Sequence, residues 1–531
     1  MKKITVILLS LCLLALTTGL FAGGKSETAE KTGESSKMTT LNVAVPALPD
    51  VLEPGSFHAL TIATYRVSYN IFNNLIEYDF KGDKGLKPAL AESWNLIDAK
   101  TLEIKLRKGV KFHNGDELTS DDVLFTFSDE RIFGDNPAVG SKKAAGYWAL
   151  FDRVEAVDRY TVKFYTKDAD PVMVNRLTQP VFQIINKRAY KEAKNFEEWS
   201  FKPVGTGPFK VKDLFPADQL ILEAHADYWG GKPEVETLIF KSVPEDSARI
   251  AGLMAGDYQV IGGVSTDLIK TIEADKNLTI EGGPSASYLA VYFNLHKPYF
   301  DVKLRKAMSL AIDRELLVKT LFSGRTRVTN GLQEPGYDKM FVKDHPYPKY
   351  DLKKAQQLVK ESVYKGESIP YYIQNDYYPN EVNVAQAMVE MWRTAGINVQ
   401  LEVKENWAQV NLEDSNKIRI LGMRNTSHTD NFGDPSGCLW RTYNPKYDAQ
   451  VFHNWKGADV DEFNKLGKVL DSSADQKERY NAFKKMLDIF DNNPPALILY
   501  QNVAFSAKRA NINWSAYRQV YMYFGPENFT Q

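Results

Sequence analysis

The spacing of apolar residues along the chain alternates between the period of a strand and the period of a helix. Residues 101–106 (TLEIKL) and 397–403 (INVQLEV) alternate apolar and polar positions, which is typical of strands with one buried face. Residues 351–362, 381–395 and 476–491 repeat their apolar positions at helical spacing. Because strand and helix signals alternate throughout, we expect a mixed α/β fold.

Two strongly apolar segments lie far apart in the chain. Residues 288–294 (YLAVYFN) are apolar, β-branched and aromatic, and residues 494–500 (PPALILY) have the same character. After the first segment, Asp301 is the expected N-cap of a helix. We interpret the first segment as a strand that carries the chain from one lobe into another, and the second as the strand that carries it back. Two such strands form a hinge, and the cleft between hinged lobes is a natural ligand site.

Length and composition limit the class of protein. A chain of 531 residues exceeds one compact core, so two or three domains are expected. With 44% hydrophobic and 25% charged residues, the composition is that of a soluble globular protein. The formal net charge of -1 argues against a general nucleic-acid binder, which would normally be basic. The aromatic content of 12% fits either aromatic-rich cores or an aromatic-lined cleft.

The N-terminus has the pattern of an export signal. Residues 1–3 (MKK) are basic, residues 4–20 are almost wholly apolar, and Ala22 offers a small residue for cleavage. The alternative is a membrane anchor, for which the apolar run is marginal in length. The polar residues that follow, 23–38, favour cleavage and suit a flexible tether. We therefore expect residues 1–22 to be a cleaved signal peptide and the protein to be exported to the periplasm or cell envelope.

The chain has two cysteines, Cys12 and Cys438. Cleavage of the signal would leave Cys438 alone, so no internal disulfide is expected. A lipid-modified cysteine would mark the cleavage point of a lipoprotein, but none lies near Ala22. Cys12 follows Leu11 rather than a small residue and would leave a very short apolar region. We therefore expect no lipid anchor.

Motifs for catalysis, phosphate binding and metal binding are weak. Residues 205–209 (GTGPF) are glycine-rich, but no Lys-Ser or Lys-Thr pair follows at the required place, which favours a tight turn into a strand. Neither a serine nucleophile elbow nor a His-Glu-x-x-His motif is found. A glycosidase pair of carboxylates is left open by the many acids. No two histidines are spaced in the sequence like the ligands of a metal site. The seven histidines are His58, His113, His225, His296, His345, His428 and His453. We expect no metal, cofactor or catalytic residue, and His113 is expected to support a turn.

A set of short motifs follows in a fixed order along the chain. They are residues 90–94 (LAESW), 106–116 (LRKGVKFHNGD), 121–123 (DDV), 205–209 (GTGPF), 228–229 (YW), 305–307 (RKA) and 311–313 (AID). With them, and over nearly its full length, the chain resembles the bacterial family 5 extracellular solute-binding proteins. These are the periplasmic oligopeptide, dipeptide and nickel receptors of ABC importers. The motifs are expected to stabilise turns and the fold, so they indicate the family and not the ligand.

The resemblance implies a two-lobe periplasmic-binding-protein fold with an extra subdomain, hinged by two crossing strands. Lobe I would comprise residues 39–78, 202–287 and 501–531, with a family-specific subdomain at residues 79–201. Lobe II would comprise residues 288–500. Closure about the hinge would bury the ligand and present a surface to a membrane permease.

The resemblance also implies a ligand site. In the peptide-binding members, an aspartate in a loop before an Asp-Pro or Glu-Pro step holds the α-ammonium group of the ligand. That loop is here residues 429–435 (TDNFGDP), in which Asp430 is the matching acid, Asp434 is the second candidate and Asn431 lies between them. A carboxylate in a closed cleft would pair with an ammonium group through charge-assisted hydrogen bonds. The alternative role for Asp430 is to form a turn. The loop also departs from the family pattern, because it carries an extra residue and lacks the tryptophan that often precedes it.

Aromatic candidates and a missing arginine bear on the ligand class. Trp407 resembles the cleft tryptophan of the family and could stack on a peptide or a sugar face, with a core position as the alternative. Trp440 and Trp455 are weaker candidates. The dipeptide receptors use an arginine at the start of the helix that corresponds to residues 381–395, but residues 378–383 (YPNEVN) contain none. This departure disfavours dipeptides and leaves longer peptides, held by main-chain bonds and water-filled pockets, and oligosaccharides, which some family members bind.

We therefore expect an exported, monomeric receptor without catalytic activity that binds oligopeptides in an interlobe cleft and delivers them to an ABC permease. An oligosaccharide receptor of the same family is the alternative. Nickel or haem-type ligands are less favoured, and a glycosidase or peptidase is less favoured still.

Overall fold

One mixed sheet of ten strands runs through the structure. The computed structural model describes residues 38–55, 61–79, 85–134, 142–375, 377–413, 422–430, 433–445, 454–517 and 520–530. The predicted signal peptide, and all of the predicted tether except residue 38, lie outside these ranges. Across the sheet the strand order is β14 (Val399–Lys404), β13 (Ile369–Gln374), β15 (Met423–Thr429), β12 (Leu278–Phe293), β16 (Ala496–Arg509), β11 (Val260–Gly262), β1 (Thr40–Val45), β10 (Thr237–Ser242), β9 (Gln219–Ala224) and β8 (Phe209–Phe215).

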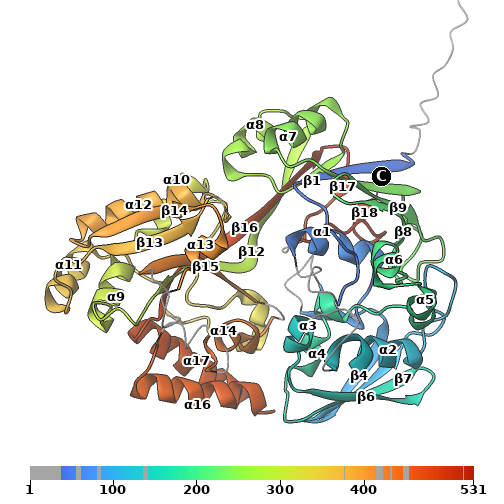
Figure 1. The fold of residues 1–531 in the computed structure, drawn as a ribbon, viewed down its shortest axis with the longest axis horizontal. Helices are drawn as coiled ribbons and strands as arrows, with labels where there is room; N and C mark the ends of the chain where they lie inside the picture. The colour runs from blue at the N-terminus through green and yellow to red at the C-terminus, as the bar shows by residue number, and fades with distance from the viewer. Residues whose placement is uncertain are drawn as a thin grey trace, which may run out of the picture. The chain divides into compact units, whose positions relative to one another are not determined.

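The two strands predicted to cross between lobes are neighbours in this sheet. β12 pairs antiparallel with β16 from Leu278 opposite Arg509 to Tyr292 opposite Ala496, and both run between the two groups of shorter strands (Figure 1). β12 begins well before the predicted segment. Its first half was missed in the sequence because it carries few apolar residues and is only partly buried. Gly282 permits the close pairing, since a β-carbon there would lie 2.1 Å from the carbonyl oxygen of Ala504. The predicted two-lobe fold with crossing strands is confirmed.

Lobe I is built on the strands at one end of the sheet. β1 is parallel to β10 and β11, whereas β8, β9 and β10 form an antiparallel meander. Its helices are α1 (Ile62–Ile71), α5 (Lys187–Glu192), α6 (Phe196–Phe201), α7 (Asp246–Ala255), η4 (Thr266–Leu268) and α8 (Ile269–Glu273). The short pairs β2 (Ile76–Tyr78) with β3 (Leu86–Pro88) and β17 (Asn513–Trp514) with β18 (Phe529–Thr530) complete its strands. One apolar core joins β1, β8, β9 and β10 to α1 and to the C-terminal residues.

A separate antiparallel sheet of four strands forms a second core beside lobe I. Its order is β4 (Ala91–Asp98), β5 (Thr101–Leu106), β7 (Thr161–Thr166) and β6 (Phe151–Asp158). Its helices are α2 (Ser120–Thr126), η2 (Asp129–Phe133), α3 (Lys142–Gly146), α4 (Met173–Arg176) and η3 (Pro180–Phe182). The alternation predicted for residues 101–106 places Leu102, Ile104 and Leu106 in this core.

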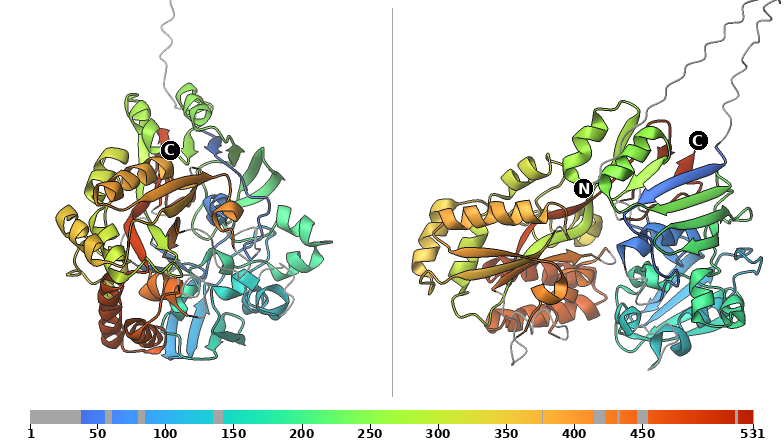
Figure 2. Two further views of the ribbon diagram at one scale, coloured as in Figure 1. Left: turned by 60° about the vertical axis from the view of Figure 1, so that its left-hand side comes forward. Right: turned by 45° about the horizontal axis from the view of Figure 1, so that its top comes forward.

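Lobe II places helices on both sides of β13, β14 and β15 (Figures 1 and 2). These helices are α9 (Val302–Leu310), α10 (Arg314–Leu321), η5 (Pro335–Met340), α11 (Leu352–Glu361), α12 (Glu381–Thr394), α13 (Trp407–Val410), η6 (Pro435–Gly437), α14 (Leu439–Tyr443), α16 (Ala458–Ser472) and α17 (Gln476–Asn492). As predicted, Asp301 caps α9, and its carboxylate accepts the backbone N–H of Leu304 at 2.8 Å. The domain bounds expected from the sequence remain a prediction.

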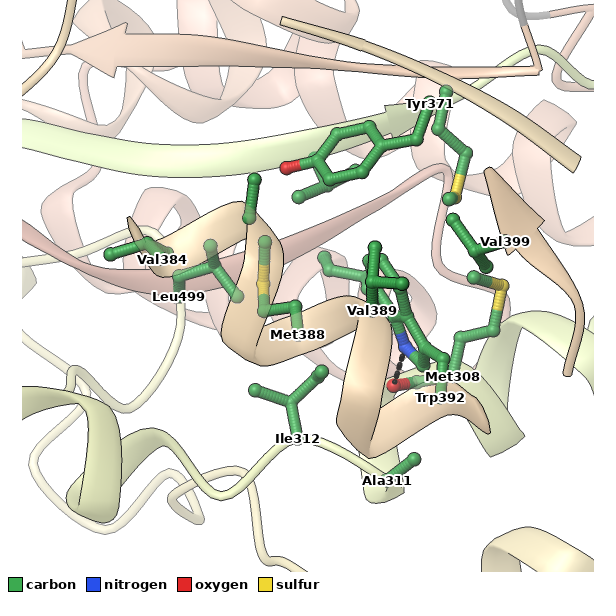
Figure 3. Close-up of a cluster of buried hydrophobic side chains, with 14 of the residues drawn as sticks. Met308, Ala311, Ile312, Tyr371, Val384, Met388, Val389, Trp392, Val399 and Leu499 are labelled. Carbon is green, nitrogen blue, oxygen red and sulfur yellow. Dashed lines mark hydrogen bonds between the residues drawn. The ribbon is translucent and has the colours of Figure 1, made fainter. Parts of the chain in front are cut away.

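The apolar stripe of α12 forms the centre of the core of lobe II. Val384, Met388 and Trp392 are fully buried against α9 and the sheet (Figure 3). The indole N–H of Trp392 donates to the carbonyl of Met308 at 3.0 Å. A buried N–H without a partner would cost about 1–3 kcal/mol, so this bond favours the observed packing of α12 against α9. Among the described residues, no helix is both long enough and apolar enough to cross a membrane.

The glycine-rich motif at residues 205–209 is a packing motif. A β-carbon on Gly205 would lie 2.2 Å from the carbonyl oxygen of Ile71, and one on Gly207 would lie 2.7 Å from that of Asn70. The N–H of Gly205 donates to Nδ1 of His113, so Nε2 of His113 carries the proton and donates to the carbonyl of Gly207. Burial lowers the pKa of His113 to about 3, which keeps the ring neutral in this role. His113 therefore supports the turn through its two hydrogen bonds, and the glycines allow the close approach of the backbone.

Two local predictions are corrected by the structure. The alternating apolar and polar residues 110–112 (VKF) predict a short strand, but they make only an isolated bridge between Lys111 and Glu117. The polar residues 425–435 predict a loop, yet β15 continues to Thr429. The polar sequence of residues 425–429 hides this strand, because β12 supplies its backbone partners through Ser287 opposite Thr429.

We expect Gly205→Ala to lower the free energy of unfolding by about 1–3 kcal/mol, because the added methyl group meets backbone that cannot move freely. Urea unfolding of residues 23–531 measures the change. Gly146→Ala is the matched control, since no atom lies within 4 Å of its β-carbon position. The control should change stability by no more than about 1 kcal/mol. Equal losses in both variants would contradict the packing role of Gly205.

Candidate ligand-binding site

A cavity of about 910 Å³ lies between the two lobes. Lobe I contributes α1 and the residues that follow β1 and β11. From lobe II, residues 377–380, Asn383, Ser427, Thr429, Asp430 and Gly433 line the cavity. The crossing strands also line it, through residues 285–287 of β12 and 502–506 of β16. This volume is at the upper end of the range for small-molecule sites. The cavity therefore has the position and the size expected for the predicted interlobe cleft.

The charged groups that line the cavity are mainly acidic. Among the lining residues that the structure describes, they are Asp79, Asp267, Glu334, Asp430 and Arg66. Four carboxylates against one guanidinium give the lining a negative balance, which favours a ligand with a positively charged group. Within the described ranges, no group of three or more His, Cys, Asp or Glu side chains is arranged to hold a metal ion.

Asp430 lies directly after β15 and lines the cavity while being 5% exposed. Its backbone N–H donates to the carbonyl of Ala286 in β12 at 2.8 Å. Its carboxylate accepts the N–H of Gly433 at 3.0 and 2.8 Å. Asp430 therefore forms the turn and also lies on the cavity wall, and its contact with an ammonium group stays a prediction.

Glu334 is a second buried acid in the same corner of the cavity. Burial raises the pKa of Tyr288 and of Tyr337 well above the usual range, and the charges of both Glu334 and Asp430 raise each pKa further. The pKa of the Cys438 thiol is raised in the same way, first by burial and then by Asp430. Two carboxylates therefore act on one group of buried side chains. We call Asp430 and Glu334 the acidic corner.

The two lobes touch around the cavity. Asn380, at the start of α12, donates from Nδ2 to Oγ1 of Thr266 in lobe I at 2.5 Å. Gly433 lies against Tyr78 of lobe I, whose hydroxyl oxygen is 2.8 Å from the position of a β-carbon on Gly433. The lining thus consists of two walls that meet at several contacts.

Asp434 lies next to this region but is not among the lining residues. Its Oδ1 accepts Nη2 of Arg479 at 2.7 Å, and it also accepts the N–H and the hydroxyl of Ser436. It is therefore the N-cap of η6 and half of a buried ion pair. Asn431, the third polar candidate, lies outside the described residues.

Trp407 is half-buried behind the rim of the cavity and is not among the lining residues. Its ring meets Tyr377 edge-on at 5.1 Å and Tyr378 at 6.4 Å, and both of these tyrosines line the cavity. The guanidinium of Arg424 lies 5.6 Å from the Trp407 ring. Trp407 therefore supports the aromatic rim from behind.

Trp440 and Trp455 belong to the core of lobe II beneath the cavity. A β-carbon on Gly467 would lie 2.1 Å from the Trp440 ring, so this ring packs against α16. Its indole N–H donates to Oδ2 of Asp471 at 2.6 Å. Trp440 and Asp471 border a second, much smaller cavity of about 40 Å³ together with Arg176 of α4.

Comparison with known proteins identifies the family. The family described as "Bacterial extracellular solute-binding proteins, family 5 Middle" matches residues 85–450, more than half of the chain. The chain belongs to this family. The proteins of this family are solute-binding proteins, and a cavity between two lobes is in keeping with that class.

Several curated relatives of this solute-binding protein cover almost the whole chain. A dipeptide-binding protein of Escherichia coli is 27% identical over 523 residues, which is 93% of this chain and 95% of that protein. The oligopeptide-binding protein AppA of Bacillus subtilis is 28% identical and covers 94% and 93%. The heme-binding protein A of Haemophilus influenzae is also 28% identical and covers 95% and 94%.

Solved structures share the fold. The substrate-binding protein CtaP of Listeria monocytogenes superimposes with a TM-score of 0.80 at 22% identity, covering 91% of this chain and 98% of that one. A periplasmic binding protein of Helicobacter pylori in complex with the peptide STSA gives 0.74 at 23% identity, covering 92% and 97%.

The arginine that the resemblance assigns to dipeptide receptors at the start of α12 is absent from this solute-binding protein, in which Asn380 and Glu381 begin the helix. Asn380 contacts lobe I, as described above, and also donates to the carbonyl of Leu321 at 2.6 Å. The buried carboxylate of Glu381 accepts Nδ2 of Asn425 at 2.9 Å and the N–H of Tyr378 at 3.1 Å. This region therefore joins elements of the protein and supplies no cation to the cavity.

Four charged residues of the described lining, Arg66, Asp79, Asp267 and Glu334, were not predicted from the sequence. Arg66 lies in a helix whose other residues are mostly apolar or neutral, and this isolation is a signal that could have been noticed. Glu334 precedes Pro335 in an irregular segment without a motif. Its position becomes meaningful only once η5 lies beside β12 and α14.

Asp471 provides a pH-dependent test of the contact between the lobes. Burial raises the pKa of Asp471 to about 6, while Arg176 and the bond from Trp440 lower it and Asp170 and Asp434 raise it. Since the folded state then holds a proton that the unfolded state has lost, this group favours folding below its unfolded pKa and opposes folding as the pH rises through about 6.

We expect Asp471→Asn to raise the free energy of unfolding by about 1–2 kcal/mol at pH 7.5 and to have no effect near pH 4. The amide oxygen can still accept the indole N–H, so the variant removes only the charge. Urea unfolding at the two pH values measures this difference. The control is Asp50→Asn, which removes an exposed carboxylate. A loss of stability at pH 7.5 would mean that attraction to Arg176 outweighs burial.

Proposed function

We propose that this protein is an exported receptor of an ABC importer that binds peptides by their free α-ammonium group and delivers them to the membrane permease. The observation that carries the proposal is the acidic corner, a pair of buried carboxylates on the wall of a large interlobe cavity. A buried carboxylate is stabilised by a cation that also donates hydrogen bonds, and an ammonium group does both. Asp430 and Glu334 are the proposed ammonium contacts.

The strand next to the acidic corner supports an extended ligand. β15 pairs with β12 along its whole length but pairs with β13 only through Met423 and Arg424. Beyond these residues, Ser427 and Thr429 line the cavity. An extended peptide can add to the edge of a strand through its own main chain, which gives affinity without a demand on side chains. A peptide with its N-terminus at Asp430 would lie along this segment.

The names of the relatives agree with this ligand class but do not decide it. Two of those described above are named for dipeptides and oligopeptides, and one is named for heme. The alternative from the sequence, an oligosaccharide, would use the aromatic rim of Tyr377 and Tyr378 in front of Trp407. We favour peptides because the acidic corner is charged, whereas a neutral sugar needs no ion pair.

Thermal melting of the exported form tests the ligand class. Pooled short peptides, the same peptides with acetylated N-termini, pooled oligosaccharides and haemin are added separately. A ligand at 100 times its dissociation constant adds about 2.7 kcal/mol to the stability of the folded state. We expect an increase of Tm with free peptides and a much smaller one with acetylated peptides. An increase with sugars or haemin alone would refute the peptide proposal.

We expect Asp430→Asn to weaken the binding of free peptides by about 10- to 100-fold, since a charge-assisted hydrogen bond contributes about 1.5–3 kcal/mol. Isothermal titration with one peptide selected by melting measures the change. The matched control is Asp267→Asn, which removes an exposed acid from the same lining. Equal losses in the two variants would indicate a general effect of cavity charge instead of a specific ammonium contact.

A further inference from the structure

We propose that Arg66 binds the carboxylate of the ligand, so that the receptor selects peptides with both ends free. The ammonium group would contact the acidic corner of lobe II, and the carboxylate would contact Arg66 of lobe I. This inference rests on the proposed function, because it concerns the other end of the same peptide.

Arg66 lies where ligands of open α/β sheets usually bind. Its Nη2 is 3.2 Å from the position that a β-carbon on Gly263 would take, and that position also contacts Pro46. Pro46 follows β1 and Gly263 follows β11, and these two strands are parallel. Arg66 therefore lies beyond the carboxyl ends of adjacent parallel strands, where the crevice of such a sheet receives its ligand. It lines the cavity at this place.

The charge of Arg66 is not balanced by the protein. Within the described residues, no carboxylate lies within ion-pair distance of its guanidinium. Burial lowers the pKa of Arg66 to about 10, and the nearby charge of Arg249 lowers it further instead of raising it. The side chain therefore remains charged at neutral pH beside a second cation.

Arg249 shows how the protein satisfies an arginine that serves the fold. Its guanidinium donates to Asp246 at 2.6 Å and to the carbonyls of Val243, Pro244 and Gly263 at 2.6–2.8 Å. Among the residues that the structure describes, no such set of acceptors surrounds the Arg66 guanidinium, although the two arginines are neighbours. A half-buried cation without acceptors is unfavourable in the free protein, and a ligand carboxylate would offset this cost. The planar fork of arginine matches the two oxygens of a carboxylate.

The division of charge between the lobes links the ligand to closure. Asp430 and Glu334 belong to lobe II, and Arg66 belongs to lobe I. A ligand with opposite charges at its two ends can contact both walls only while they face each other across the cavity. A peptide that lacks one charge would lose one wall, and with it part of the free energy that favours the closed form.

The test is isothermal titration of the exported form with one peptide in three forms, which are the free peptide, its C-terminal amide and its N-acetyl derivative. For the unmodified protein, we expect amidation to weaken binding by about 10- to 100-fold. In Arg66→Gln, the free peptide should bind as weakly as the amide. Arg66→Lys should recover part of the difference between the two. The control is Arg393→Gln, an exposed position on α12, which should retain the full difference.

The outcomes separate the two proposals. If the free peptide and its amide bind the unmodified protein equally while acetylation weakens binding, the role of Arg66 is refuted and the peptide receptor stands. If no form of the peptide binds, the proposed function fails, and the role of Arg66 fails with it. Melting of Arg66→Gln without ligand adds a structural readout. We expect its Tm to equal or exceed that of the unmodified protein, and a lower Tm would show that Arg66 serves the fold.

Discussion

The pairing of β12 with β16 is the constraint on which the rest of the structure depends. The two strands pair over almost their whole length and carry the chain into lobe II and back. Because side chains alternate along a strand, a register shift of one residue would exchange the side chains that β12 contributes to the two cores on its opposite faces. The pairing is interrupted between Pro284 and Tyr288, where residues 285–287 line the cavity. The element that joins the lobes thus also forms part of the ligand site.

Charge is distributed unevenly over the two walls of the cavity, and this distribution decides which ligands it favours. The acidic corner lies in lobe II beside β15, whereas Arg66 lies in lobe I beyond the ends of β1 and β11. Neutral contacts such as Asn380 with Thr266 bring the walls together. A ligand whose charges are opposite to those of both walls is favoured over a neutral one, which makes a receptor selective.

Much of the fold could be predicted from the sequence, because strong local patterns coincide with the elements found. The apolar stripe of α12 and the capping residue Asp301 are local signals, and the structure follows them closely. The polar half of β12 and the end of β15 could not be predicted. Their strand conformation comes from partners that are distant in the chain, such as Arg509 for Leu278 and Ser287 for Thr429.

The sequence by itself determined the family, the two-lobe architecture and the loop that carries Asp430, since motifs and hydrophobic periods are written in neighbouring residues. Only the tertiary structure decided which charged side chains share the cavity. Asp434 and Asp430 are four positions apart, yet the first is paired with Arg479 and the second lines the cavity. Arg66 and Glu334 carry no motif and meet the same cavity through folding alone. The physical reason is that a side chain's environment is set by packing between distant segments, which local sequence does not encode.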